Sequence, residues 1–260
     1  TNVLIEAGYS VSVLSRSDKE NTNEITYYKW DLNKNYIDEN AVLNADFIIH
    51  LAGEGIVEKR WTEKRKKAIL ESRTKPIDLI FSVLEKNNKK LDAFISASGV
   101  GIYGAVTSHK ICTEETPAAN DFLGTTCQIW ENAVDKIEAL GIRTVKIRTA
   151  IVLGKDEGFL KKVNPNFKAG FGAVLGSGKQ YLPWIHIEDL SQIYCKAVSY
   201  DQMHGPYNAA VTDNTTNSRF SKILASLYGY AIWLPKIPPF ILKIVLGEMS
   251  EAVLTGQRVS

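Results

Sequence analysis

Short apolar strands alternate with amphipathic helices through residues 1–155, and this alternation limits the fold more than any other feature of the chain. The runs at 45–50 and 93–96 are almost continuously apolar, as expected of parallel strands that are covered on both faces. A long helical pattern at 123–140 leads into another strand at 144–148. The pattern predicts an α/β fold with a Rossmann-type, doubly wound parallel sheet.

The remaining elements of this part follow the same alternation. The chain opens on the end of a helix, and short strands are predicted at 10–14 and 25–28. Two consecutive helices are predicted at 62–73 and 76–86, because Pro76 is acceptable in the first turn of a helix.

The composition changes after Gly154, where a glycine-rich stretch is followed by a tail marked by prolines. We therefore predict a dinucleotide-binding Rossmann domain over 1–155, with 185–212 returning to it. Residues 156–184 and 213–260 would form a smaller C-terminal α/β lobe that supplies the substrate pocket.

The beginning of such a domain is missing from the pattern. A dinucleotide-binding sheet starts with a strand and a Gly-rich turn, whose helix N-terminus receives the pyrophosphate. Residues 3–8 already have the pattern of a helix end. We expect the first strand and its glycine loop to precede Thr1, over roughly 15 residues. The alternative is a fold that never had them.

Charge and cysteine content narrow the classes of partner. The 31 basic and 29 acidic residues leave a formal charge of +2, so a small-molecule substrate is favoured over nucleic acid or a membrane. Cys112, Cys127 and Cys195 lack the spacing of a disulfide framework, which predicts a cytoplasmic protein. The four histidines lack metal-ligand spacing, so no metal is expected. The sequence leaves a homodimer open.

Polar residues after the first two predicted strands indicate a cofactor site. Ser15 and Arg16 stand where the adenosine ribose of a dinucleotide would lie. An arginine there offers a fork for a 2′-phosphate, whereas NAD is bound by a carboxylate, so NADP is preferred over NAD. The alternative for Arg16 is a solvated loop charge. Asp31 would either face the adenine amino group or cap a turn.

Three further groups of residues are candidates for the same site. Leu51, Ala52 and Gly53 end a strand and would let the cofactor approach the backbone, unless they form an ordinary turn. Arg73 would contact the cofactor's phosphates or ribose, or belong to a solvated helix face. The run at 95–104 ends an apolar strand in small residues and hydroxyls, Ser96 and Ser98 among them, and would form the floor of an active site.

Together these segments resemble the extended short-chain dehydrogenase/reductase superfamily of NAD(P)-dependent epimerases and dehydratases. They are most similar to an atypical, NAD-dependent epimerase/dehydratase-like branch of bacterial proteins of uncharacterised substrate that also has animal homologues. The resemblance implies the upstream glycine loop and a few dozen residues after Ser260. The matching segments are Leu51–Glu54, Arg60–Trp61, Ser72–Arg73, Ile95–Gly104, Trp130–Glu131, Arg148–Gly154, Gly176–Gly178, Trp184–Leu190, Gly247–Met249 and Gly256–Arg258.

The resemblance also implies a catalytic Tyr and Lys four residues apart, which this chain lacks. With Glu131 as the anchor, Leu123 stands at the Tyr position and Cys127 at the Lys position. Ser98, or Ser96, remains as the substrate-binding hydroxyl, and Val152 would lie beside the nicotinamide.

Three substitutes for the missing acid are conceivable: Tyr103, Cys127, or a group that the substrate brings. Tyr103 is favoured as a buried anchor and Cys127 as an inert apolar residue. The leading hypothesis is an NADP-binding oxidoreductase or epimerase-like enzyme with an altered active site, acting on a small hydroxylated or nucleotide-linked substrate. The alternative is a catalytically silent NADP-binding sensor or interaction protein.

Overall fold

The computed structural model describes residues 1–155 and 158–260. Its strands are β1 (Val11–Ser15), β2 (Ile25–Asp31), β3 (Tyr36–Ile37), β4 (Phe47–His50), β5 (Ala93–Gly99), β6 (Ile111–Cys112), β7 (Thr144–Thr149), β8 (Ile151–Gly154), β9 (Trp184–His186), β10 (Gly205–Ala209) and β11 (Arg258–Val259). Its α-helices are α1 (Asn2–Glu6), α2 (Asn40–Leu43), α3 (Glu63–Asn87), α4 (Phe122–Glu138), α5 (Gly158–Lys168), α6 (Ile187–Ser199), α7 (Asn217–Leu227), α8 (Pro239–Leu246) and α9 (Glu251–Leu254). Two 3₁₀ turns, η1 (Val100–Tyr103) and η2 (Gly247–Ser250), complete the fold.

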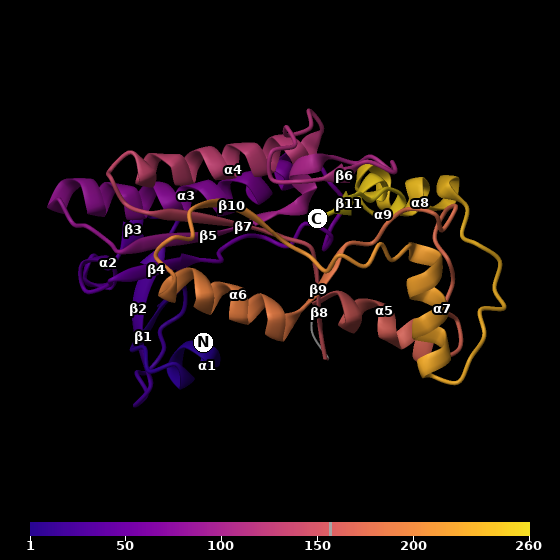
Figure 1. Ribbon diagram of the computed structural model, residues 1–260, viewed down its shortest axis with the longest axis horizontal. Coiled ribbons are helices and arrows are strands. Elements are labelled where there is room, and N and C mark those ends of the chain that lie inside the picture. Colours follow the sequence, from indigo (N-terminus) through magenta and orange to yellow (C-terminus); the bar gives the residue numbers. More distant parts are fainter. Residues whose placement is uncertain (156–157) are drawn as a thin grey trace.

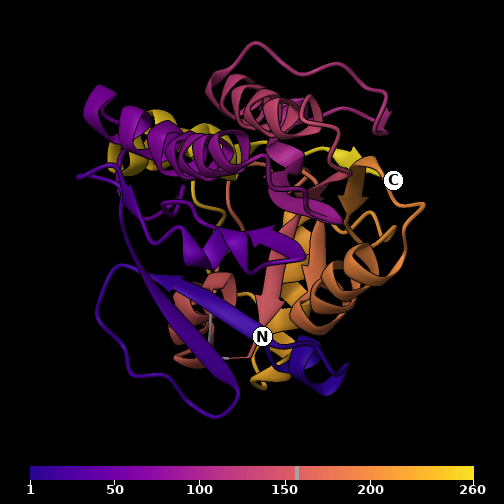
Figure 2. The ribbon, with the colours of Figure 1, turned by 90° about the vertical axis from the view of Figure 1, so that its left-hand side faces the viewer.

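The central sheet has the strand order β10-β7-β5-β4, and all of its pairings are parallel. Helices α3 and α4 cover one face of this sheet and α6 covers the other (Figures 1 and 2). Helices on both faces of a parallel sheet define a doubly wound fold. The predicted Rossmann-type α/β fold is therefore confirmed.

A second sheet precedes the central one in the chain. Strand β1 pairs in parallel with β2, and the short β3 returns antiparallel to β2. In the described part of the chain, β1 pairs only with β2 and β4 pairs only with β5. Each of these two strands therefore keeps one open edge.

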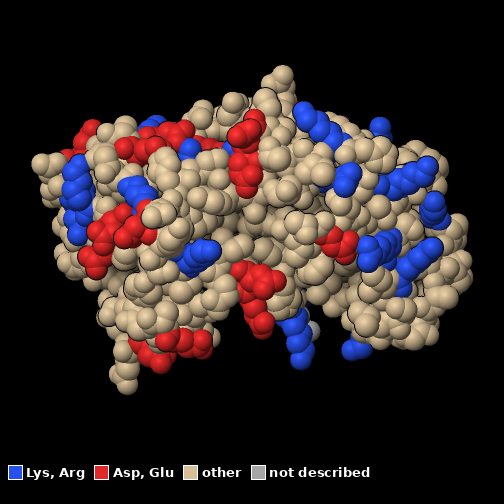
Figure 3. Space-filling view, in the orientation of Figure 1, with Lys and Arg blue, Asp and Glu red and all other residues tan. Residues whose placement is uncertain are grey.

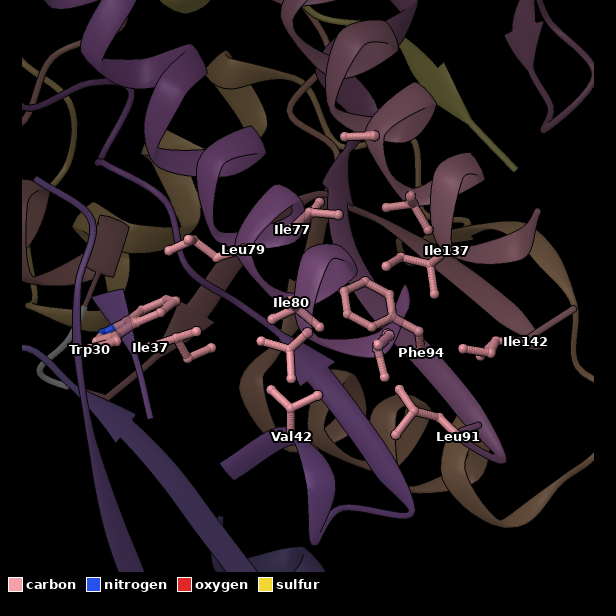
Figure 4. Close-up of a cluster of buried hydrophobic side chains, with 14 of the residues drawn as sticks. Trp30, Ile37, Val42, Ile77, Leu79, Ile80, Leu91, Phe94, Ile137 and Ile142 are labelled. Atoms are coloured by element: carbon pink, nitrogen blue, oxygen red, sulfur yellow. The ribbon is translucent and has the colours of Figure 1, made fainter. Parts of the chain in front are cut away.

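Two apolar cores lie on opposite faces of the central sheet, because successive side chains of a strand point to opposite sides. Phe94 of β5 is fully buried among residues of α3 and α4, including Ile80 and Ile137 (Figure 4). Its neighbour Ile95 faces the other way and joins Ile147 of β7 in the core under α6. The sheet is thus buried on both faces, as the apolar runs predicted.

The two helices predicted on either side of Pro76 are wrong, because the structure has a single helix, α3, through this residue. Pro76 itself is buried, and buried positions recur on the same face before and after it, from Ile69 to Ile80 and Leu84. Proline in a helix interior removes a hydrogen bond and costs about 3 kcal/mol. The burial of this continuous face offsets that cost, so tertiary packing outweighs the local signal.

The structure contains short strands that the sequence pattern did not predict. Strand β8 pairs in parallel with β9, and β6 pairs in parallel with β11 near the C-terminus of the chain. Helices α5, α7 and α8 lie together at one end of the molecule (Figure 1). The predicted boundary of the C-terminal lobe at 155/156 adjoins residues 156 and 157, which lie outside the described residues.

Candidate cofactor and active site

The end of β1 carries two of the predicted cofactor residues. Arg16 is exposed, and Ser15 donates a hydrogen bond from its hydroxyl to the carbonyl of Ser17 at 2.8 Å. Both line a cavity of about 560 Å³, whose other walls come from Val13, Leu14, Ser17, Lys19 and Trp30. An exposed guanidinium beside an open cavity can receive an anionic group.

Asp31 at the end of β2 has a local structural role. Its Oδ1 accepts a hydrogen bond from the backbone N–H of Asn33 at 3.0 Å. The carboxylate therefore caps a turn, which is one of the two roles that the sequence allowed.

The turn after β4 packs on the buried side chain of Arg73. The guanidinium of Arg73 is buried, donates to the carbonyls of Ile69 at 2.8 Å and Glu54 at 3.0 Å, and lies 5.0 Å from the ring centre of Trp130. A Cβ on Gly53 would stand 3.1 Å from the Cζ of Arg73, so only glycine fits without displacing it. Arg73 shapes the backbone of this turn, whereas Leu51 is 61% exposed on its outer side.

Glu54 is the charged residue of the same turn. Its carboxylate pairs with Arg65 of α3, and its backbone N–H donates to the hydroxyl of Ser72 at 2.9 Å. The hydrogen bond from Arg65 lowers the pKa of Glu54, and the positive charges of Arg65, Arg16 and Lys59 act in the same direction. The carboxylate is thus ionised at neutral pH.

His50, the last residue of β4, is a buried neutral group. Its Nε2 donates to the carbonyl of Arg73 at 3.1 Å, and its ring lies 6.2 Å from those of Phe94 and Trp130. Burial lowers the pKa of His50 to about 4. The imidazole therefore carries no charge at neutral pH and belongs to the support of the turn after β4.

A ladder of polar pairs joins α4 to β7, and we call it the α4–β7 ladder. Glu131 accepts two hydrogen bonds from Arg148, each of 2.8 Å. One turn further along α4, Asp135 pairs with Lys146. The hydroxyl of Thr144 then donates to Glu138 at 2.9 Å. Alternate residues of β7 thus face acidic residues at helical spacing on α4.

Ser98 lies at the deepest rung of this ladder. Its hydroxyl donates to the Oε1 of Glu131 at 2.7 Å, and its side chain is buried. Burial alone would lower the pKa of Arg148, but the hydrogen bonds and charge of Glu131 raise it. The hydroxyl of Ser98 therefore rests against the ion pair of Glu131 and Arg148. Ser96 is fully buried and donates to the carbonyl of Ala97 at 2.9 Å.

Tyr103 extends the same network toward the C-terminal end of the chain. Its hydroxyl donates to the Oδ1 of Asn208 at 2.6 Å and accepts from Arg148 at 3.1 Å. Asn208 in turn donates to the carbonyl of Ser260 at 3.0 Å. Burial raises the pKa of Tyr103. These contacts agree with a buried anchor.

Leu123 and Cys127 stand on the first turns of α4, against the loop that follows β5. A Cβ built on Gly101 would lie 3.5 Å from Leu123 and 3.9 Å from the sulfur of Cys127. Cys127 is buried, and its desolvation raises the pKa of the thiol to about 12. The thiol is therefore protonated at neutral pH, and both residues act as apolar packing.

Val152 lies on β8, paired with Ile185 of β9. His186, the last residue of β9, accepts a hydrogen bond at Nδ1 from the N–H of Glu188 at 3.3 Å and so caps α6.

Sequence reasoning gave Glu131 and Arg148 no side-chain role, although both stood in segments of the resemblance. The signal was present in two patterns. Thr144, Lys146 and Arg148 place polar groups on one face of a strand whose other face is apolar. Glu131 and Asp135 repeat at the spacing of a helix face. Reading the two patterns together would have predicted their pairing.

The parallel sheet, its helices on both faces and the glycine turns at strand ends define a dinucleotide-binding α/β protein. The sequence matches the NAD dependent epimerase/dehydratase family over residues 1–210. The chain belongs to this family.

Relatives and solved structures extend the likeness over nearly the whole chain. The chain is 36% identical over 259 residues to "Epimerase family protein YfhF" of Bacillus subtilis, spanning 99% of the chain and 84% of that protein. It is 30% identical to mouse "Epimerase family protein SDR39U1", spanning 100% of the chain and 86% of that protein. The crystal structure of human SDR39U1 (isoform 2) with NADPH superimposes with a TM-score of 0.83 at 26% identity, covering 99% of this chain and 85% of that one.

The low pKa of His50 predicts a pH-dependent stability. Unfolded chains bind a proton at this residue with a pKa near 6.5, whereas the folded protein resists protonation until about pH 4. Because the unfolded state binds more protons between these values, stability rises with pH across this window and is lost as pH falls through it. The difference corresponds to about 3 kcal/mol.

Urea unfolding from pH 4 to pH 7 measures this effect. We expect His50→Gln to lose most of the rise, while the exposed-site control His109→Gln keeps it. An unchanged slope in His50→Gln would contradict the assignment.

From the α4–β7 ladder we expect Glu131→Leu to lower the free energy of unfolding more than removal of both Glu131 and Arg148 does. Loss of Glu131 alone leaves the charge of Arg148 buried and unpaired, at a cost of about 3 to 5 kcal/mol. The double variant Glu131→Leu/Arg148→Met removes both charges and should be closer to wild type in its free energy of unfolding. As a control, Asp78→Asn breaks the exposed pair with Lys136 and should cost less than about 1 kcal/mol. A double variant less stable than Glu131→Leu would show that the ladder does not act in this way.

Proposed function

We propose that this protein is an NADP-dependent, epimerase-like oxidoreductase with an altered active site. Its substrate would be a small hydroxylated or nucleotide-linked molecule. The observation that carries the proposal is the exposed guanidinium of Arg16 in the wall of the cavity at the end of β1. The three free cysteines are compatible with a reducing compartment, which supports a cytoplasmic protein.

The preference for NADP rests on the charges around this cavity. Arg16 presents a planar fork that suits a 2′-phosphate, and Lys19 lines the same cavity. The nearest carboxylate in sequence, Asp18, pairs with Lys29 at 2.6 Å and so is engaged on β2. A solved relative, human SDR39U1, was crystallised with NADPH.

Three predicted groups would hold the rest of the cofactor. The exposed backbone of Leu51, Ala52 and Gly53 would contact the adenosine and diphosphate, with Arg73 fixing the turn from beneath. Val152 would lie beside the nicotinamide. When bound, the nicotinamide supplies hydride transfer, and the protein's residues bind and orient it.

The open edges of β1 and β4 support the expectation of a further strand between them, with its glycine loop. Cofactor binding is therefore best measured on two chains, residues 1–260 and a version extended at its N-terminus.

The proposed chemistry is slow acid/base catalysis, because Leu123 and Cys127 carry no usable proton. Ser98 is the remaining hydroxyl, and its own proton is directed at Glu131. Tyr103 and Cys127 are fixed by burial, so a group on the substrate is the better source of the proton. The apolar packing of Leu123 and Cys127 favours a second candidate function, a catalytically silent NADP-binding sensor.

Titration with NADPH and NADH tests the cofactor proposal. Loss of the fork in Arg16→Ala removes about 1.5 to 3 kcal/mol, so the preference for NADPH should fall by about tenfold or more. Lys19→Ala, which changes a flexible ammonium on the same cavity, should reduce the preference less. Equal affinities for the two cofactors in wild type, or an unchanged ratio in Arg16→Ala, would refute the proposal.

Turnover tests the chemistry separately. NADPH oxidation with a panel of ketones and sugar nucleotides should be slow in wild type, because positioned acid/base groups typically contribute about 10² to 10⁴ in rate. The substitution Ser98→Ala should lower the activity more than Cys127→Ser does. Rapid turnover lost only in Tyr103→Phe would make Tyr103 the acid. Tight NADPH binding without turnover would favour the sensor.

A further inference from the structure

Large apolar side chains are exposed along the segment from the end of α7 to the end of α8. This segment runs along the right-hand end of the molecule in Figure 1. Leu227 is 74% exposed, Trp233 65%, Phe240 63% and Ile244 69%. We call this set, with Tyr230 and Val245, the apolar rim: Leu227, Tyr230, Trp233, Phe240, Ile244 and Val245.

The rim is held in place by the structure. The indole N–H of Trp233 donates to the carbonyl of Gly170 at 2.8 Å, and its ring centre lies 6.3 Å from that of Phe171, which is also exposed. Helix α8 exposes most of its length, since only Leu242 is buried in it. Trp233 is therefore anchored to the loop at Gly170, and the exposed side chains of α8 are displayed by a helix.

The charge around the rim is one-sided. Residues 158–187 and 214–247 contain eight lysines and arginines and no aspartate or glutamate. On the face that Figure 3 shows, Lys and Arg gather over this end with one acidic patch beside them, while most Asp and Glu lie at the centre and the opposite end, among further Lys and Arg. In the described part of the chain, only Arg219 of these eight residues forms an ion pair, with Asp213. The net charge of +2 for the whole chain conceals this division.

We propose that this end of the molecule binds the surface of a membrane rich in anionic phospholipid. Exposed aromatic and aliphatic side chains among lysines are the composition that inserts at the boundary of headgroups and acyl chains. The lysines attract anionic headgroups, and their long stems let the charge stay in water while the rim enters the interface. None of the helices in the described residues is long and apolar enough to cross a bilayer, so the contact would be peripheral.

Charge complementarity favours this occupant over a second copy of the chain. Two copies that meet through this end would bring together, on each side, the seven lysines that form no ion pair in the described part of the chain, while Asp213 is engaged by Arg219. An anionic lipid surface supplies the opposite charge and an apolar layer at once. A nucleic acid would supply the charge but not the apolar layer that Leu227 and Ile244 require.

Co-sedimentation of the chain with vesicles tests the proposal. We expect binding to vesicles that contain phosphatidylglycerol in phosphatidylcholine, little binding to pure phosphatidylcholine, and loss of binding at high salt. Lys168, Lys222 and Lys243 are exposed lysines on α5, α7 and α8. Replacing all three by Gln should weaken binding by about 100-fold, from about 1 kcal/mol for each charge.

Two variants and one control separate the contributions. Trp233→Ala/Phe240→Ala should reduce binding without changing the charge. The matched triple variant Lys34→Gln/Lys67→Gln/Lys75→Gln makes the same change in charge on the β2–β3 turn and α3, and should bind as wild type does. Thermal unfolding shows whether each variant is folded.

Four results would overturn the proposal. The first is no binding to anionic vesicles, and the second is equal loss in the two triple variants. The third is a dimer in sedimentation velocity that Trp233→Ala/Phe240→Ala converts to monomer, with vesicles unbound. The fourth is binding to single-stranded RNA under the same conditions, with vesicles unbound.

Discussion

The buried ion pair between Glu131 and Arg148 is the interaction on which the arrangement of the candidate site depends. It joins α4 to β7 in the interior, and it accepts the hydroxyl of Ser98 from β5 on the same carboxylate. The Nη1 of the guanidinium donates to the hydroxyl of Tyr103 and to the carbonyl of Glu114. A charge that is desolvated this deeply is tolerated only with all of its partners in place. The ends of β5 and β7 are therefore fixed together.

This network borders the apolar first turns of α4. On the first turns of α4, Leu123 and Cys127 pack against the glycines of the loop that follows β5. The polar groups that do exist nearby are committed to one another. The strand ends thus form a rigid platform whose polar side chains are already paired with one another.

The sequence predicted those parts of the fold that depend on local periodicity. Runs such as 45–50 and 93–96 specify buried strands, and the long helical pattern at 123–140 predicted α4. The sequence did not predict elements whose structure depends on contacts between segments far apart in the chain. Pro76 is held in a continuous helix by the burial of a face that only the folded sheet supplies. The pairing of β8 with β9 joins segments that are apart in the chain, and no local pattern identifies it.

The candidate site was predicted to a similar degree. Ser15, Arg16 and the turn at 51–53 could be located because strand ends are recognisable in sequence. The roles of Arg73 and His50 could not, because a buried arginine under a glycine turn and a neutral histidine look the same in sequence as solvated ones. Their functions depend on desolvation and on the carbonyls that they meet.

The α4–β7 ladder has a consequence for how the chain folds. Its three rungs join residues that are only 6, 11 and 17 positions apart in the chain. Closing such short loops costs little chain entropy, whereas β10 must return to β7 across the whole of α6. Proteins rich in local contacts fold fast for this reason. The unit of α4 and β7 is therefore the part of the central sheet whose side-chain pairs cost the least chain entropy to bring together.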